Sequence, residues 1–193
     1  MKLKNSILPI VLGLACIALL TACSPDKPEN EKINKLHEDP TMCVFTLTEG
    51  SLRSGVSFNS MPQEADFVPT NNVQKIIWQV EKGENFKIGE EGLSKFVVKS
   101  IKTNPNVVYS LRIDYYNAKG NSMNNQFFEN EQDKIHQHFF MYYTNNGAHN
   151  VLVKNREELP YEYTYADSYK GKFIGESNPM GFFGFIRFLQ PDT

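Results

Sequence analysis

One segment alternates apolar and polar side chains so regularly that it limits the choice of fold more than any other part of the chain. Residues 107–115 read VVYSLRIDY. The apolar positions of one parity are Val107, Tyr109, Leu111, Ile113 and Tyr115, and the polar positions of the other are Ser110, Arg112 and Asp114. A period of two residues is that of a β-strand, because successive strand side chains point to opposite sides. The segment therefore predicts a strand with one side in a hydrophobic core.

Most other apolar stretches are short, rich in Val, Ile, Phe and Tyr, and separated by Gly, Asn and Pro, which is typical of strands and turns. The expected strands are 42–48, 75–80, 96–101, 107–116, 123–128, 136–143, 151–154, 162–165, 172–174 and 182–189. Two turn sequences, 117–120 (NAKG) and 144–147 (TNNG), predict hairpins. Residues 129–134 fit one helical turn or a polar loop. We expect an all-β fold, an antiparallel β-sandwich with a barrel as the alternative, and at most one short helix.

The first 22 residues predict a lipoprotein signal peptide rather than part of the fold. Lys2 and Lys4 precede the apolar stretch 7–20, and the segment 20–23 (LTAC) resembles the bacterial lipobox. A transmembrane helix is the alternative, but the stretch is shorter than the roughly 20 residues that a bilayer needs, and Pro9 interrupts it. The resemblance implies that Cys23 is lipidated and anchors the protein to a membrane.

The residues after Cys23 predict a flexible tether. Residues 24–31 (SPDKPENE) are acidic, contain proline and have no apolar side chain, so we assign 23–38 to the lipidated Cys and tether and 39–193 to a single β-rich domain. Ser24 in place of Asp favours the outer membrane over the inner one. The early acidic cluster resembles the surface-export signal of Bacteroidota lipoproteins, although a simple spacer fits equally well. The location is thus the outer membrane, with the cell surface as one option.

Charge and cysteine content exclude several classes of protein. Without Lys2 and Lys4 the chain keeps 18 basic and 22 acidic residues, a net charge near −4, and it has no basic patch for nucleic acid. Cys16 leaves with the leader and Cys23 is lipidated, so Cys43 remains alone and no disulfide forms within the domain. Cys43 alternates in phase with Phe45 and Leu47, which predicts a buried thiol.

The segment 134–143 (KIHQHFFMYY) contains the strongest candidate for a ligand site. On a strand His136 and His138 project from the same side, about 6.5 to 7 Å apart, so both imidazoles can approach one metal ion or a haem. Phe140, Met141 and Tyr142 would supply the apolar wall of a haem pocket. With a carboxylate from 129–131, the two histidines would suit zinc or a similar divalent ion. The alternative, at even odds, is that both histidines face solvent on an edge strand.

The other two histidines are weaker candidates. His149 lies in the turn after the aromatic segment, so the chain reversal brings it back toward His136 and His138. His37 stands at the end of the tether. A lone loop histidine usually faces water.

The motifs of common enzymes are missing from the sequence. It has no G-x-S-x-G elbow, Walker loop, dinucleotide fingerprint or C-x-x-C pair. No group of residues suggests a particular reaction, so we expect a binding protein and not an enzyme.

Several segments together resemble a set of Bacteroidota lipoproteins of poorly defined role. They are 37–41 (HEDPT), 44–50 (VFTLTEG), 104–106 (NPN), 133–140 (DKIHQHFF) and 177–182 (SNPMGF). The resemblance implies an outer-membrane or surface lipoprotein that accompanies a TonB-dependent receptor and captures metal or haem. This chain departs from that set in 51–61, where the relatives carry histidines and it has none.

Two functions follow as hypotheses. The first is capture of a transition metal or haem near His136 and His138 for a TonB-dependent transporter. The alternative is an adhesin, a fimbria-associated subunit or a glycan-binding lipoprotein that uses no cofactor.

Overall fold

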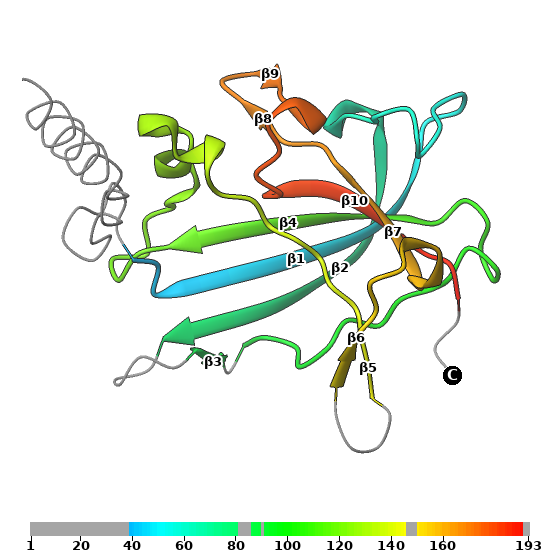
Figure 1. The fold of residues 1–193 in the computed structure, drawn as a ribbon, viewed down its shortest axis with the longest axis horizontal. Coiled ribbons are helices and arrows are strands. Elements are labelled where there is room, and N and C mark those ends of the chain that lie inside the picture. Colours follow the sequence, from blue (N-terminus) through cyan, green and yellow to red (C-terminus); the bar gives the residue numbers. More distant parts are fainter. Residues whose placement is uncertain (1–38, 81–85, 90, 146–149, 191–193) are drawn as a thin grey trace, which may run out of the picture. The chain divides into compact units, whose positions relative to one another are not determined.

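The alternating segment forms β4 (Val108–Tyr116), in the interior of a six-stranded antiparallel sheet. The structure is a computed structural model, and it describes residues 39–80, 86–89, 91–145 and 150–190. The sheet has the order β3-β2-β1-β4-β10-β7 (Figure 1). Its other strands are β1 (Met42–Leu52), β2 (Phe67–Val80), β3 (Phe86–Ile88), β7 (Tyr161–Tyr165) and β10 (Phe183–Phe188).

The remaining elements are short. Two hairpins stand apart from the main sheet: β5 (Tyr143–Asn145) with β6 (Asn150–Leu152), and β8 (Ser168–Tyr169) with β9 (Lys172–Phe173). The helices are all 3-10 turns: η1 (Glu64–Asp66), η2 (Asn124–Phe127), η3 (Glu129–Lys134), η4 (Arg156–Glu158) and η5 (Gly175–Ser177). The expected all-β antiparallel fold is confirmed, and the described strands close no barrel. Residues 129–134 form the helical turn that was one of their two expected structures.

The core lies mainly on one side of the sheet, which we name the inner side. Neighbouring strands place apolar side chains there in register: Leu47 of β1 is opposite Leu111 of β4, and Tyr109 of β4 is opposite Ile186 of β10. Cys43 joins this side and is only 4% exposed, so the predicted buried thiol is confirmed. Burial raises the pKa of Cys43 to about 12, which keeps it a neutral thiol.

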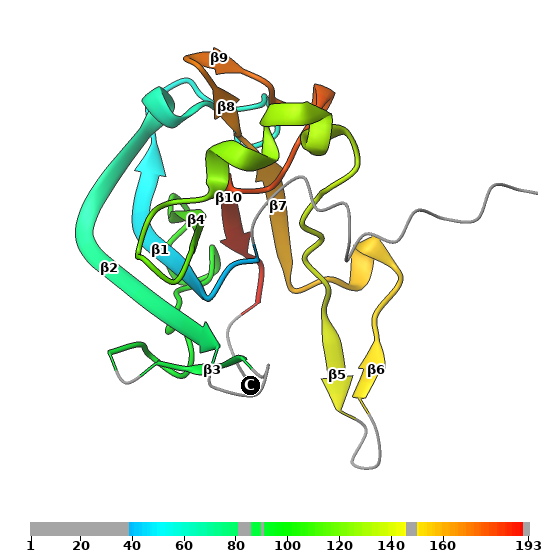
Figure 2. The ribbon, with the colours of Figure 1, turned by 90° about the vertical axis from the view of Figure 1, so that its left-hand side faces the viewer.

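Irregular segments, not strands, cover the inner side. Residues 96–101 pack on Leu47 and Tyr109, and residues 127–140 pack on Ile113 and Phe182. The fold is therefore sandwich-like, with the sheet as one layer and extended or 3-10 segments as the other (Figure 2). On the opposite side Phe58, Phe67 and Phe173 cover Phe183 and Phe185.

Three of the expected strands do not form: 96–101, 123–128 and 136–143. Each segment makes single backbone hydrogen bonds to the sheet or to Met180, and side chains supply others. The Gln74 amide pairs with both backbone groups of Val97, at 2.7 Å and 2.8 Å. The Asn124 amide pairs with the Tyr115 N–H and the Ile113 carbonyl along the free edge of β4, both at 2.8 Å.

Of the two predicted turns, the one at 117–120 is present. Gly120 has a φ of 76°, and Tyr116 forms a bridge with Ser122 across that turn before the chain enters η2. The second predicted turn, 144–147, falls between the paired strands β5 and β6, and its residues 146 and 147 lie outside the described residues.

The described residues belong to one compact unit, Leu36–Thr193. The expected signal peptide 1–22 and the lipidated Cys23 with its tether 23–38 lie outside the described part of the chain and stay predictions. No helix among the described residues combines the length and the apolar character required to cross a membrane.

Candidate functional site

Residues 136–142 follow the turn residue Ile135 and lie outside any strand, and β5 begins at Tyr143. Side chains at even positions from His136 to Tyr142 are half-buried, and those at odd positions are exposed. The Tyr165 hydroxyl donates to the His138 carbonyl and the Tyr161 hydroxyl donates to the Phe140 carbonyl, both at 2.7 Å. Tyrosines of β7 thus hold the segment over the inner side, in place of a ladder. The expected parity was right, and the expected strand was wrong.

His138 has a partner for each ring nitrogen. Its Nδ1 lies 2.8 Å from the Met180 carbonyl oxygen, and its Nε2 lies 2.8 Å from the Tyr115 hydroxyl. A carbonyl oxygen only accepts, so Nδ1 carries the proton and Nε2 accepts from the tyrosine. The ring is also stacked on Tyr115, with centroids 5.7 Å apart, and packs against Phe182 at 5.3 Å. Burial lowers the pKa of His138, which favours the neutral ring, and these contacts favour its Nδ1–H tautomer.

His136 lies on the same side of the segment. Its Nδ1 is 3.0 Å from the carbonyl oxygen of Gln132, and its ring meets Phe127 edge to face at 5.9 Å. Phe127 also packs on Phe182 and Tyr115, the two aromatic partners of His138. Both imidazoles therefore border one aromatic cluster, although its rings are not the Phe140 and Tyr142 that the sequence indicated.

The other proposed ligands do not gather around this pair. Within the described residues no group of three or more His, Cys, Asp or Glu side chains is arranged to hold a metal ion. His37 and His149 lie outside the described part of the chain. Of the proposed haem-pocket residues, Phe140 packs inward on Tyr163 at 4.2 Å and Tyr142 is half-buried, but Met141 points outward. For His138 to bind a metal through Nε2, that nitrogen would have to give up the Tyr115 hydroxyl.

The exposed side of the same segment carries a row of large apolar side chains. Ile135, Phe139, Met141 and Tyr143 are 74%, 69%, 59% and 50% exposed. We name these four residues the outer row; Gln137 lies between them in sequence. Phe139, Met141 and Tyr143 are exposed apolar side chains at every other position, and with Ile135 they form a cluster typical of an interaction surface. The alternation of the segment contains a sequence signal for the outer row: if the even positions face the inner side, the odd positions face outward.

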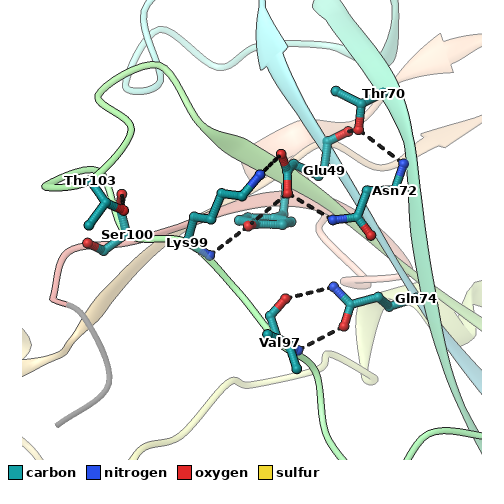
Figure 3. A network of polar contacts seen from close by, with 9 residues as sticks. Glu49, Thr70, Asn72, Gln74, Val97, Lys99, Ser100 and Thr103 are labelled. Atoms are coloured by element: carbon teal, nitrogen blue, oxygen red, sulfur yellow. Dashed lines mark hydrogen bonds and ion pairs between the residues drawn. The ribbon is translucent and has the colours of Figure 1, made fainter.

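A second polar cluster, which the sequence did not reveal, surrounds Glu49 of β1 (Figure 3). The Lys99 ammonium lies 2.6 Å from its Oε1, and the Asn72 amide donates to its Oε2 at 2.9 Å. The Tyr109 hydroxyl accepts from the Lys99 backbone N–H at 2.8 Å. Hydrogen bonding to Lys99 is the largest cause that lowers the pKa of Glu49. The Glu49 carboxylate is kept ionised and its oxygens are hydrogen-bonded, so it is a poor proton acceptor. The role of this cluster is therefore structural: it attaches residues 97–100 to the sheet.

No protein-family model matches the chain, and no curated protein or solved structure matches it either. The fold and site thus define a mostly β domain with an aromatic-lined histidine pair on one side of a segment and an exposed apolar row on the other.

The buried imidazole predicts a specific pH dependence. Burial lowers the pKa of His138, so the folded state binds that proton less readily than the unfolded chain does. Its contribution to stability is complete above the unfolded pKa, near 6.5, and is lost as the pH falls through the folded value. We expect the free energy of unfolding, measured with urea, to drop between pH 7 and 5 in the native protein. The drop should be smaller in His138→Gln; an equal drop in both proteins would contradict this assignment.

Proposed function

We propose that this protein is a membrane-anchored interaction module that binds a protein partner through the outer row and uses no cofactor. The observation that carries the proposal is the outer row itself: four large apolar side chains, at least half exposed, on one side of a segment that is pinned from behind. Tyr, Phe and Met are enriched in protein interfaces, and a pinned segment loses little conformational entropy on binding.

The surroundings of the outer row favour a protein over a lipid surface. The adjoining η3 carries three acidic residues against Lys134, and η4 carries two against Arg156, so both are net acidic: Glu129, Glu131, Asp133, Glu157 and Glu158. Anionic membrane surfaces attract basic segments, whereas these flanks are acidic and the chain without its leader has a net charge near −4. A partner with an apolar surface and a basic rim fits this arrangement.

The hairpin of β5 and β6 extends the surface. It projects away from the six-stranded sheet in both views (Figures 1 and 2), and it begins with Tyr143 of the outer row. Residues 24–38, if they form the expected tether, would span about 20 Å as a random coil. A partner in the same membrane would therefore meet the domain at high effective concentration. A TonB-dependent receptor is the partner that the lipoprotein resemblance implies.

Capture of a transition metal or haem is the second candidate function. It is favoured by the position of His136 and His138 beside one aromatic cluster. We rank it lower because both ring nitrogens of His138 already have protein partners. The free energy of metal binding at Nε2 would have to exceed the free energy lost when the half-buried hydrogen bond to Tyr115 breaks.

Site-specific crosslinking in the producing cells tests the interaction module. A benzophenone side chain at position 139 or 141 is expected to form one discrete adduct with a membrane protein, identified by mass spectrometry. The same probe at Lys119, on the exposed turn after β4, is the matched control and should form none. Replacing Ile135 and Tyr143 by Ser should reduce the adduct several-fold while changing stability little, because both side chains are largely exposed.

The outcomes separate the two functions. Adducts with lipid alone, or an adduct as strong from position 119, would refute the protein partner. The same purified protein is expected to contain no stoichiometric metal and to give no Soret shift with haem. Stoichiometric binding of either ligand, lost in His136→Ala, would favour the second candidate.

A further inference from the structure

A hollow on the opposite side of the fold is lined by cationic and hydroxyl groups. Its volume is about 540 Å³, within the range of small-molecule sites. The loop 53–58 that follows β1 forms one wall, residues 105–108 at the start of β4 form another, and Arg187 of β10 closes it. The lining contains two arginines and no Asp or Glu. That balance stands out in a chain with more acidic than basic residues.

The contacts of Arg187 orient its guanidinium group for binding an oxyanion. Its guanidinium carbon lies 4.5 Å from the centre of the Phe58 ring, and its Nε donates to Glu162 Oε2 at 2.5 Å. Phe58 is itself buried, so the stack fixes the plane of the guanidinium. Within the described residues the two terminal nitrogens of Arg187 have no protein partner. A planar guanidinium with both terminal groups open suits a carboxylate, sulfate or phosphate.

Arg53 supplies the second charge. Arg53 lines the hollow, is exposed and forms no ion pair with a described residue, whereas Glu162 already offsets part of the charge of Arg187. The hollow therefore keeps an uncompensated positive charge. An anion bound there would approach two guanidinium groups from a lining free of carboxylates.

The rest of the lining fits a polyhydroxylated molecule. Ser51, Ser54, Ser57 and Asn106 offer hydroxyl and amide groups, and Leu52, Val56 and Val107 offer small apolar patches. Gly55, with a φ of 84°, makes the turn that brings Ser54 and Ser57 to the same wall. A sugar ring presents both hydroxyls and apolar C–H faces. An inorganic anion would use the arginines and leave these other groups unused.

We propose that this hollow binds an anionic carbohydrate, with its carboxylate or sulfate on Arg187 and Arg53 and its ring hydroxyls on the serines and Asn106. The site lies on different elements from the outer row and does not depend on the protein partner. Uronic acids and sulfated sugars share this chemistry, so both belong in the test.

Calorimetric titration of the full-length lipoprotein in detergent tests the proposal. The probes are a galacturonic acid oligomer, a sulfated glucosamine oligomer, a neutral glucose oligomer and inorganic phosphate. We expect saturable binding of at least one anionic oligomer, weakened by salt, and weaker binding of the neutral oligomer and of phosphate. Arg53→Gln should reduce the affinity about tenfold, since it removes one charge-assisted contact. Arg156→Gln, on the exposed η4, is the matched control and should change nothing.

Several results would overturn the proposal. They are an absence of saturable binding to either anionic oligomer, equal binding of the neutral oligomer or of phosphate, and unchanged affinity in Arg53→Gln. Because Arg53 is exposed, its replacement should not unfold the protein. Arg187→Lys gives a second check that keeps the charge, and it should weaken binding because an ammonium lacks the planar pair of parallel N–H donors that matches two oxygens of the anion.

Discussion

Replacing Asp167 by alanine is expected to lower the free energy of unfolding by about 3 kcal/mol. Asp167 is 1% exposed, and its two carboxylate oxygens accept the backbone N–H groups of Gly181 and Phe183 at 2.8 Å and 2.9 Å. The variant would leave both N–H groups buried without an acceptor, at about 1–3 kcal/mol each. Burial raises the pKa of Asp167, because the carboxylate has lost solvation. Removing this charge therefore offsets part of the loss in the free energy of unfolding.

The effect should spread to the histidine site. Gly181, with a φ of 80°, lies between Met180, whose carbonyl binds the His138 ring, and Phe182, on which that ring packs. Loosening 180–183 therefore removes one of the two contacts that fix the His138 tautomer. The Met180 hydrogen bond and the Asp167 charge both raise the pKa of His138 against the effect of burial, so we expect Asp167→Ala to lower that pKa further below its unfolded value, which proton NMR can measure.

Two control variants make the result specific. Asp167→Asn keeps the size and one acceptor oxygen, so its cost should be intermediate. Asp66→Ala removes an exposed carboxylate that accepts the Gln63 N–H at 2.8 Å, and should cost about 1 kcal/mol or less. Urea denaturation at constant slope measures all three. A loss below 1 kcal/mol in Asp167→Ala would show that the turn 180–183 does not need its acceptor.

The sequence predicts this fold correctly where a segment makes its backbone hydrogen bonds to a neighbouring strand, and less well where side chains are the partners. The centre of the sheet was predictable, because β1 and β4 pair with each other and their alternating apolar residues fill one core. The Cys43 thiol was placed for the same reason. The turn at Gly120 followed from local chemistry, since its positive φ costs glycine little.

The covering segments were not predictable in the same way. Val97 and Ile113 complete their backbone hydrogen bonds with the side-chain amides of Gln74 and Asn124. His138 and Phe140 do so with tyrosine hydroxyls of β7. An extended segment held by side chains has the same alternation as a strand, so periodicity alone cannot separate the two.

In the candidate site, too, local features were predictable from the sequence and long-range contacts were not. The sequence indicated that His136 and His138 share a side, which is a local property of extended backbone. It could not indicate that Tyr115 and Met180, far away in sequence, occupy both ring nitrogens of His138. The Arg187 hollow was hidden for the same reason, because Arg53, Phe58 and Arg187 meet only through the order of the sheet.

Gly184→Ala is the second substitution with a large expected effect, a loss of about 3 kcal/mol in the free energy of unfolding. Gly184 lies in β10 between Leu111 of β4 and Tyr165 of β7. A Cβ there would come within 2.5 Å of the Thr164 carbonyl oxygen and of the Tyr163 ring carbon Cζ. The first is backbone, and the second belongs to a ring held by Phe140 at 4.2 Å and Tyr165 at 5.0 Å. Neither neighbour can move without disturbing β7 or the histidine segment.

A double-mutant cycle with Tyr163→Phe tests that explanation. The Tyr163 hydroxyl is buried and has no hydrogen-bond partner among the described residues, so its removal alone should be neutral or slightly stabilising. Because the hydroxyl is also close to the added methyl group, the double variant should regain about 1 kcal/mol relative to Gly184→Ala. Gly89→Ala, whose Cβ would meet only side-chain atoms at 3.3 Å or more, should cost little. Equal losses in Gly89→Ala and Gly184→Ala, or strict additivity in the cycle, would refute the close packing of Tyr163 on Gly184.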